Sequence, residues 1–186
     1  MSHDAEDMTR VHDDAPVTSS KKESGARDLL AESVTINRSA SEIYAFWRDP
    51  SNLVAVMENI VSIEPIDRAR SRWTVKAPAG REVSWVSEIT HDIEDREIIW
   101  QSQPDAEVAN SGRIEFIDAG ERGTVVRATI AYEPPFGTVG KFIAKLFQRE
   151  PKLQARRDLR RLKQLMETGE VATAARTRAQ LEEEKA

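Results

Sequence analysis

The stretch RSRWTVKAPAGREVSWVSEITHDIEDREIIWQS (residues 70–102) decides the fold, because it contains three consecutive strand-like segments separated by turn residues. Within 70–77, 82–93 and 97–102, apolar and polar residues alternate, as they do in a strand that buries one face. Trp73, Trp85 and Trp100 share the phase of their apolar neighbours. We therefore expect three indole rings on one face of an antiparallel sheet, and such an apolar face requires a covering layer.

The alternation continues on both sides of this stretch. Runs at 60–66, 111–117 and 124–132 add three more strands, and short turns rich in Gly, Asp and Glu join them all. Six sequential strands with short turns predict an antiparallel meander. Upstream, a strand at 32–37 is followed by Ser39 and Glu42 at capping-box spacing, which predicts a helix, and Asp49-Pro50 begins a second short helix.

The covering layer is supplied by a helical stretch from about 138 to 168. Its apolar stripe changes phase along the chain: the stripe before Pro151 includes Phe142 and Leu146, and the stripe after it includes Leu159 and Leu162. The two stripes differ in direction by roughly 140° at about 100° per residue. A proline interrupts helical hydrogen bonding, so we predict a kink or break near Pro151, with the first half as a movable lid.

Length and composition indicate one domain with charged tails. The chain has 186 residues, 39% of them hydrophobic and 32% charged, with a net charge of -5 and no cysteine. We expect a disordered N-terminal arm at 1–30, the domain at 31–169 and a charged tail at 170–186. The acidic balance disfavours nucleic acid as a partner. An acidic N-terminus and the lack of a long apolar run predict a cytoplasmic protein.

A set of local strings, in this order, carries a family resemblance: VTINRSASEIY (34–44), Trp47, Trp73, VSWVSEI (83–89), IWQS (99–102), GTVV (123–126), YEPP (132–135) and DLRRLKQLMETGE (158–170). Over about 33–170 the chain resembles the START/Bet v 1-like (SRPBCC) superfamily, and within it the bacterial polyketide cyclase/dehydrase-like group related to coenzyme-Q-binding proteins. The resemblance implies an α+β helix-grip fold, in which a curved antiparallel sheet wraps a long C-terminal helix. It also implies lipids, quinones, steroids or polyketides as ligand classes.

Three functions follow for the face that the tryptophans share. The first is a carrier, sensor or chaperone that binds a hydrophobic small molecule between sheet and helix. The second is a cyclase- or dehydratase-type enzyme acting on a polyketide-like or aromatic substrate, and the third is a peripheral membrane or protein-interaction module with a solid core. No catalytic residue, cofactor or metal is predicted, and the residues expected to line a ligand site are Trp73, Val75, Trp85, Ser87, Ile89, Trp100, Ser102, Ile114, Phe116, Ala128, Ile130, Tyr132, Phe142 and Leu146.

Charged residues outside that face suggest weaker alternatives. His91 lies near the end of a strand and is interpreted as a solvated side chain, although Asp92 and Glu94 are close to it. The mixed charges that alternate with core positions, such as Arg113 and Glu115, predict a solvated outer face with cross-strand ion pairs. The segment 141–163 is strongly basic. We expect it to allow weak contact with an anionic membrane through Lys141, Lys145 and Arg149, which would place the protein peripherally at the inner face of that membrane.

Overall fold

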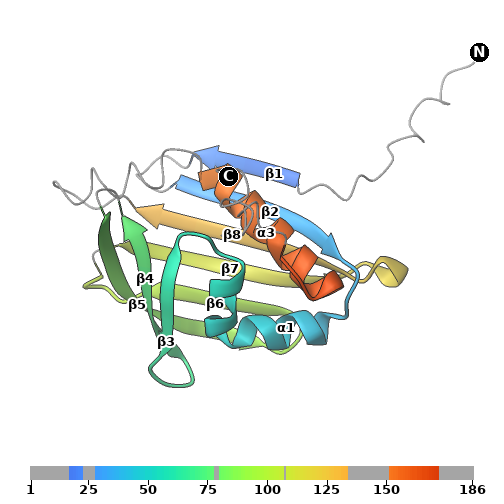
Figure 1. The fold of residues 1–186 in the computed structure, drawn as a ribbon, viewed down its shortest axis with the longest axis horizontal. Helices are drawn as coiled ribbons and strands as arrows, with labels where there is room; N and C mark the ends of the chain where they lie inside the picture. Colours follow the sequence, from blue (N-terminus) through green and yellow to red (C-terminus); the bar gives the residue numbers. More distant parts are fainter. Residues whose placement is uncertain (1–16, 23–27, 78–79, 107, 134–150, 172–186) are drawn as a thin grey trace, which may run out of the picture.

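A curved antiparallel sheet with helices on its inner side makes up the described part of the protein (Figure 1). The computed structural model describes residues 17–22, 28–77, 80–106, 108–133 and 151–171. Its elements are β1 (Val17–Lys22), β2 (Asp28–Ile36), α1 (Ala40–Arg48), η1 (Pro50–Ala55), β3 (Ile60–Pro65), β4 (Arg70–Ala77), β5 (Arg81–Ile93), β6 (Glu97–Ser102), β7 (Ala109–Asp118), η3 (Gly120–Arg122), β8 (Thr124–Glu133) and α3 (Pro151–Thr168).

The strand order confirms the predicted meander. The eight described strands form one sheet in the order β1-β2-β8-β7-β6-β5-β4-β3, and every neighbouring pair is antiparallel. Strands β3 to β8 are therefore sequential neighbours, while β2 lies beside β8. The alternation in the sequence located β3 to β8 to within two residues at each end, whereas β2 begins four residues before the predicted start, and the α+β helix-grip arrangement is confirmed.

The predicted disordered arm at 1–30 is wrong in part. Residues Val17–Lys22 form β1, which pairs with β2, and β2 itself begins at Asp28. The remaining residues of that stretch lie outside the described residues. An edge strand such as β1 is held by main-chain hydrogen bonds to its neighbour, and these require no hydrophobic periodicity, so the polar sequence concealed it.

Two short helices connect β2 to β3, as the sequence predicts. The Oγ of Ser39 accepts a hydrogen bond from the Glu42 amide, and the Glu42 carboxylate accepts one from the Ser39 amide at 3.0 Å, which completes the capping box. Helix α1 then buries Ile43 and Trp47, which are one turn apart. Asp49 caps the following 3-10 helix η1, whose first residue is Pro50.

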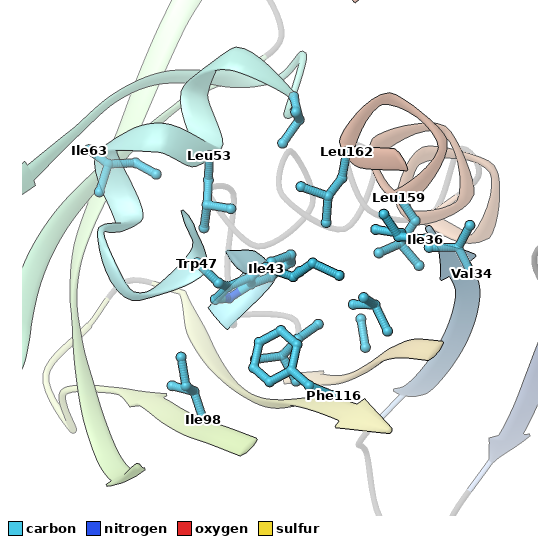
Figure 2. Packing of buried hydrophobic residues seen from close by; sticks show 14 residues of the cluster. Val34, Ile36, Ile43, Trp47, Leu53, Ile63, Ile98, Phe116, Leu159 and Leu162 are labelled. Atoms are coloured by element: carbon cyan, nitrogen blue, oxygen red, sulfur yellow. The ribbon is translucent and has the colours of Figure 1, made fainter. Parts of the chain in front are cut away.

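The main core lies where α1, η1 and α3 meet the inner face of the sheet. Figure 2 shows side chains from all of these elements turned toward one another. They include Ile43 from α1, Leu53 from η1, Leu162 from α3 and Phe116 from β7, each no more than 5% exposed. Burial of these apolar side chains against one another is the dominant favourable term holding the helices to the sheet.

Helix α3 crosses the β2 side of the sheet (Figure 1). Leu159 and Leu162 are 3% and 0% exposed, as the stripe after Pro151 predicts. The helix ends at Thr168, where Gly169 adopts a φ of 79° and donates its amide hydrogen to the Leu165 carbonyl oxygen at 2.8 Å. The described helix begins at Pro151, and the predicted kink and lid fall on residues outside the described ones.

Candidate functional site

Three tryptophans share the inner face of the sheet, as predicted. Trp73 and Trp85 are direct cross-strand partners, and their rings stack with centroids 6.3 Å apart and planes 15° apart. Trp100 is the cross-strand partner of Ile89, which has the same phase as Trp85 along β5. We call Trp73, Trp85 and Trp100 the tryptophan wall.

The tryptophan wall contacts two separate clusters. Trp73 and Trp100 pack against the main core, to which α3 contributes Leu159 and Leu162. Trp85 packs instead against a smaller cluster formed by Val75, Val83 and Val108, in which no described residue of α3 takes part. The expectation that all three rings face the C-terminal helix is therefore met in part. Trp73 and Trp100 join the cluster to which α3 contributes, whereas Trp85 joins a cluster that contains no described residue of α3.

Gly112 creates the space for the Trp100 ring. The two residues are cross-strand partners on β7 and β6, and a Cβ atom built on Gly112 would lie 2.6 Å from Cε2 of Trp100. Real Cβ atoms do not approach a ring so closely. The indole therefore lies across the backbone of β7, and only glycine at this position permits that placement.

Exposure divides the inner face into two regions. Near α1, η1 and α3, side chains such as Ile36, Ile43 and Ile114 are completely buried. The tryptophan wall stays only half-buried on the same face, as do Ile89 and Ile130. Large apolar side chains on the concave face of a sheet thus remain partly accessible, which is a typical property of surfaces that receive apolar ligands.

The other residues predicted to line the site fall into three groups. Val75, Ile114, Phe116 and Ala128 belong to the buried clusters, and Ser87 is 6% exposed. Tyr132 pairs through its backbone with Asp28 and Asn110. Nothing further is described for the Tyr132 side chain, and Phe142 and Leu146 lie outside the described residues.

Two of the polar groups expected to hold a ligand already have partners in the protein. The indole nitrogen of Trp73 donates a hydrogen bond to the Ser71 hydroxyl oxygen at 2.9 Å. The Ser102 hydroxyl oxygen accepts one from the Asn110 amide at 3.0 Å. These bonds fix side-chain orientation, and they leave the wall itself essentially apolar.

Glu32 is a buried carboxylate that sequence reasoning missed. It is 1% exposed and lies on β2 in the same phase as the buried Val34 and Ile36. Neither of its carboxylate oxygens has a hydrogen-bond partner, and Nε of Arg156 on α3 is 3.8 Å from Oε2. The signal was present in the sequence, because a charged residue in phase with two apolar ones points into the core.

Helix α3 is tied to β2 and the following turn by a second polar cluster. Lys163 donates from Nζ to the Thr35 carbonyl oxygen at 2.8 Å and to Oε1 of Glu167 at 3.0 Å. The Asn37 amide donates to the same Glu167 oxygen at 2.7 Å. Burial alone would raise the pKa of Glu167, but these hydrogen bonds lower it below its usual value.

Asp158 lies elsewhere on α3, where it meets the turn after η1 at the backbone of Glu58. Its Oδ1 accepts a hydrogen bond from Nε2 of Gln154 at 2.8 Å, and burial raises its pKa to about 6. The neighbouring Arg161 pairs with Glu58 at 2.9 Å. A carboxyl group with this pKa changes charge close to neutrality.

A β-bulge reverses the phase of β5 near its end. The register between β5 and β6 shifts between Ile89 and His91, so Asp92 becomes the partner of the buried Ile98. Asp92 accepts a hydrogen bond from the Tyr44 hydroxyl at 2.8 Å and pairs with Nε of Arg48 at 2.7 Å. Burial, followed by the hydrogen bond to Asp92, raises the pKa of Tyr44. Asp92 therefore holds α1 on the sheet.

The outer face matches its predicted solvated character. The His91 side chain is 51% exposed, with Nε2 3.3 Å from Oε1 of Glu97. Arg113 lies 3.4 Å from Glu97, and Arg127 lies 3.7 Å from Glu115. These are exposed cross-strand ion pairs of mixed sign, which contribute little to stability and form no anion site.

Neither a metal site nor a membrane-spanning helix is found among the described residues. In that part of the chain, no three His, Cys, Asp or Glu side chains come together as metal ligands. No helix there has the length and apolar character needed to cross a bilayer. The candidate site therefore consists of the tryptophan wall on the inner face of the sheet, and the buried Glu32 on β2, approached by Arg156 of α3, is a separate polar feature of the same side.

A curved antiparallel sheet whose inner face is partly covered by a C-terminal helix, with accessible aromatic rings beside it, defines a helix-grip protein. The chain belongs to the polyketide cyclase/dehydrase and lipid transport family, whose model matches residues 36–160. None of the curated proteins searched matches the sequence.

Solved structures share this fold. DR_A0006 from Deinococcus radiodurans is 39% identical with a TM-score of 0.62, and the alignment covers 76% of this chain and 99% of that one. TTHA0849 from Thermus thermophilus is 25% identical over 75% and 94% of the two chains, with a TM-score of 0.57. The Zhui aromatase/cyclase from Streptomyces sp. R1128 is 14% identical over 78% and 99%, with a TM-score of 0.60, and shares the fold.

Proposed function

We propose that this protein binds a hydrophobic small molecule, such as a lipid, a quinone or a polyketide, against the tryptophan wall. The observation that carries the proposal is the half-buried state of Trp73, Trp85 and Trp100 on a face whose remaining apolar side chains are mostly buried. Partly accessible aromatic rings on a concave surface gain free energy when an apolar ligand displaces water from them. The family description, which includes lipid transport, supports the same conclusion.

The arrangement of the described Asp and Glu side chains fits a binding role without catalysis best. Asp92 is paired with Arg48, and Asp158 lies on α3 with Gln154 as its hydrogen-bond donor. Both carboxylates are thus engaged with protein partners, Asp92 with Arg48 and Tyr44 and Asp158 with Gln154, which favours a structural role over proton transfer to a bound molecule. The buried carboxylate of Glu32 is the observation that favours the second candidate, a cyclase- or dehydratase-type enzyme acting on a polyketide-like substrate.

Native mass spectrometry and a fluorescence titration test the proposal together. Protein purified without detergent is expected to carry an apolar mass, and 2-methoxynaphthalene is expected to quench tryptophan emission with saturation. Trp85→Ala removes one stacked ring and should weaken probe binding by about tenfold. The matched control is Ile93→Ala, because Ile93 is 39% exposed but out of phase with the inner face.

The outcomes separate the three functions. A co-purifying molecule that is released chemically unchanged indicates a carrier, and a molecule that is converted to a product on incubation indicates an enzyme. If no apolar mass is present and the probe does not saturate, the inner face is a solid core and the proposal is wrong.

A further inference from the structure

We propose that Glu32 and Arg156 form a polar anchor that selects apolar ligands carrying a hydroxyl group, such as a phenol or an alcohol. This inference rests on the proposed function, since it assigns a ligand class to the same inner face. It starts from a buried carboxylate that lacks a hydrogen-bond partner in the protein.

The Glu32 carboxylate has no hydrogen-bond donor. Its side chain is 0% exposed, and neither oxygen has a hydrogen-bond partner. Nε of Arg156, at 3.8 Å, is near enough to attract the negative charge and too far to donate a hydrogen bond. A buried polar group without a partner is strongly unfavourable, and such groups in native proteins are usually completed by water, an ion or a ligand.

The position of the carboxylate connects it to the tryptophan wall. Glu32 is the cross-strand partner of Ala128, which in turn pairs with Ile114 on β7. The next inward-facing positions along the same strands are Ile130 on β8 and Gly112 on β7. Gly112 pairs with Trp100 and lies beneath its ring. The row of the carboxylate and the row of Trp100 are therefore adjacent along the strands, while β8 and β7 lie between β2 and β6, and the Trp100 ring already reaches across to β7.

Among the described residues, no side chain donates a hydrogen bond to the Glu32 carboxylate, so a ligand can supply the donor. Glu32 pairs through its backbone with Thr18 on β1 and with Ala128 on β8, whose small apolar side chain offers no hydrogen, and neither carboxylate oxygen has a hydrogen-bond partner. From above, α3 contributes Arg156 and then, one turn further, the apolar Leu159. A ligand lying along the sheet from Trp100 would reach the carboxylate with its polar end.

The chemistry of the pair favours a hydroxyl group over other polar groups. An ionised carboxylate only accepts hydrogen bonds, and a guanidinium only donates them. A hydroxyl group does both, so its hydrogen can go to Glu32 while its oxygen accepts from Arg156. A ligand carboxylate would instead place a second negative charge beside Glu32, and a methyl ether has no hydrogen to donate.

Two naphthalenes of similar size and different hydrogen-bonding capacity test the anchor. The probes are 2-naphthol, which carries a hydroxyl group, and 2-methoxynaphthalene, in which a methyl group replaces its hydrogen. Wild-type protein should bind 2-naphthol at least tenfold more tightly, because a site built around a buried acceptor rejects an analogue that leaves it unpaired. Glu32→Met should abolish this preference, with both dissociation constants measured by tryptophan quenching.

Two further variants serve as controls. Glu32→Gln keeps an acceptor oxygen and should retain part of the preference even if Glu32→Met does not fold. Glu115→Gln removes a carboxylate from the exposed outer face and should leave the preference unchanged.

Failure of the anchor is distinguishable from failure of the proposed function. If both probes bind equally well to the wild-type protein, or if the preference survives in Glu32→Met, the anchor is refuted while ligand binding stands. If neither probe binds the wild-type protein, the proposed function is refuted, and the anchor with it.

Discussion

Replacing Gly112 with alanine is expected to destabilise the protein through one defined collision. The added Cβ would lie 2.6 Å from both Cε2 and Cη2 of Trp100, closer than such atoms approach in real structures. The indole is rigid and packed against the main core, so ring and strand must move together. Overpacking of this kind costs about 1–3 kcal/mol, and the better strand-forming tendency of alanine offsets about 0.5–1 kcal/mol.

The expected net loss is about 1–2 kcal/mol, equivalent to a fall in melting temperature of about 2–8 °C for a chain of this size. Urea unfolding followed by circular dichroism measures it. A double-mutant cycle isolates the collision: in a Trp100→Leu background, Gly112→Ala should be neutral or stabilising. Equal cost in both backgrounds, or no cost in the wild-type background, would show that the ring does not lie on Gly112.

Three further predictions concern residues outside the tryptophan wall. Asp158 has a folded pKa of about 6 against an ordinary value of 3.8, so its contribution to stability is present below pH 3.8 and is lost as the pH rises through 6. Asp158→Asn should accordingly raise the free energy of unfolding by about 1–2 kcal/mol at pH 8 and leave it unchanged at pH 3.5, and a gain of the same size at both pH values would contradict the assigned pKa. Ser39→Ala removes the capping box of α1 and should cost about 1 kcal/mol in chemical denaturation, whereas no measurable loss would mean that the box is dispensable. His91→Ala should change stability by less than about 0.5 kcal/mol and should leave probe binding unchanged, and loss of binding would restore an acid-base role for His91.

The sequence predicted what depends on local pattern. Period-two alternation located β3 to β8, and it correctly placed Trp73, Trp85 and Trp100 on one face. Ser39 and Glu42 identified the start of α1, and Gly169 identified the end of α3. These features are encoded by neighbouring residues, so they can be read without knowledge of the tertiary structure.

What the sequence did not predict depends on contacts between distant segments. Strand β1 is specified by main-chain pairing with β2, and its side-chain pattern did not reveal it. The bulge after Ile89, which turns Asp92 toward α1, is a matter of register with β6. The approach of Arg156 to Glu32 depends on how α3 lies across β2, which no periodicity specifies.

The central claim, that ligands bind at the tryptophan wall, is tested most directly by the indole N–H signals in nitrogen-15 NMR spectra. The chain has four tryptophans, and the fourth, Trp47, is only 9% exposed and belongs to the main core. Single Trp→Phe variants assign the four signals. On titration with 2-naphthol, we expect the signals of Trp73, Trp85 and Trp100 to shift with one common dissociation constant while that of Trp47 stays nearly fixed. If the three remain fixed, or if only Trp47 moves, the tryptophan wall is not the binding surface.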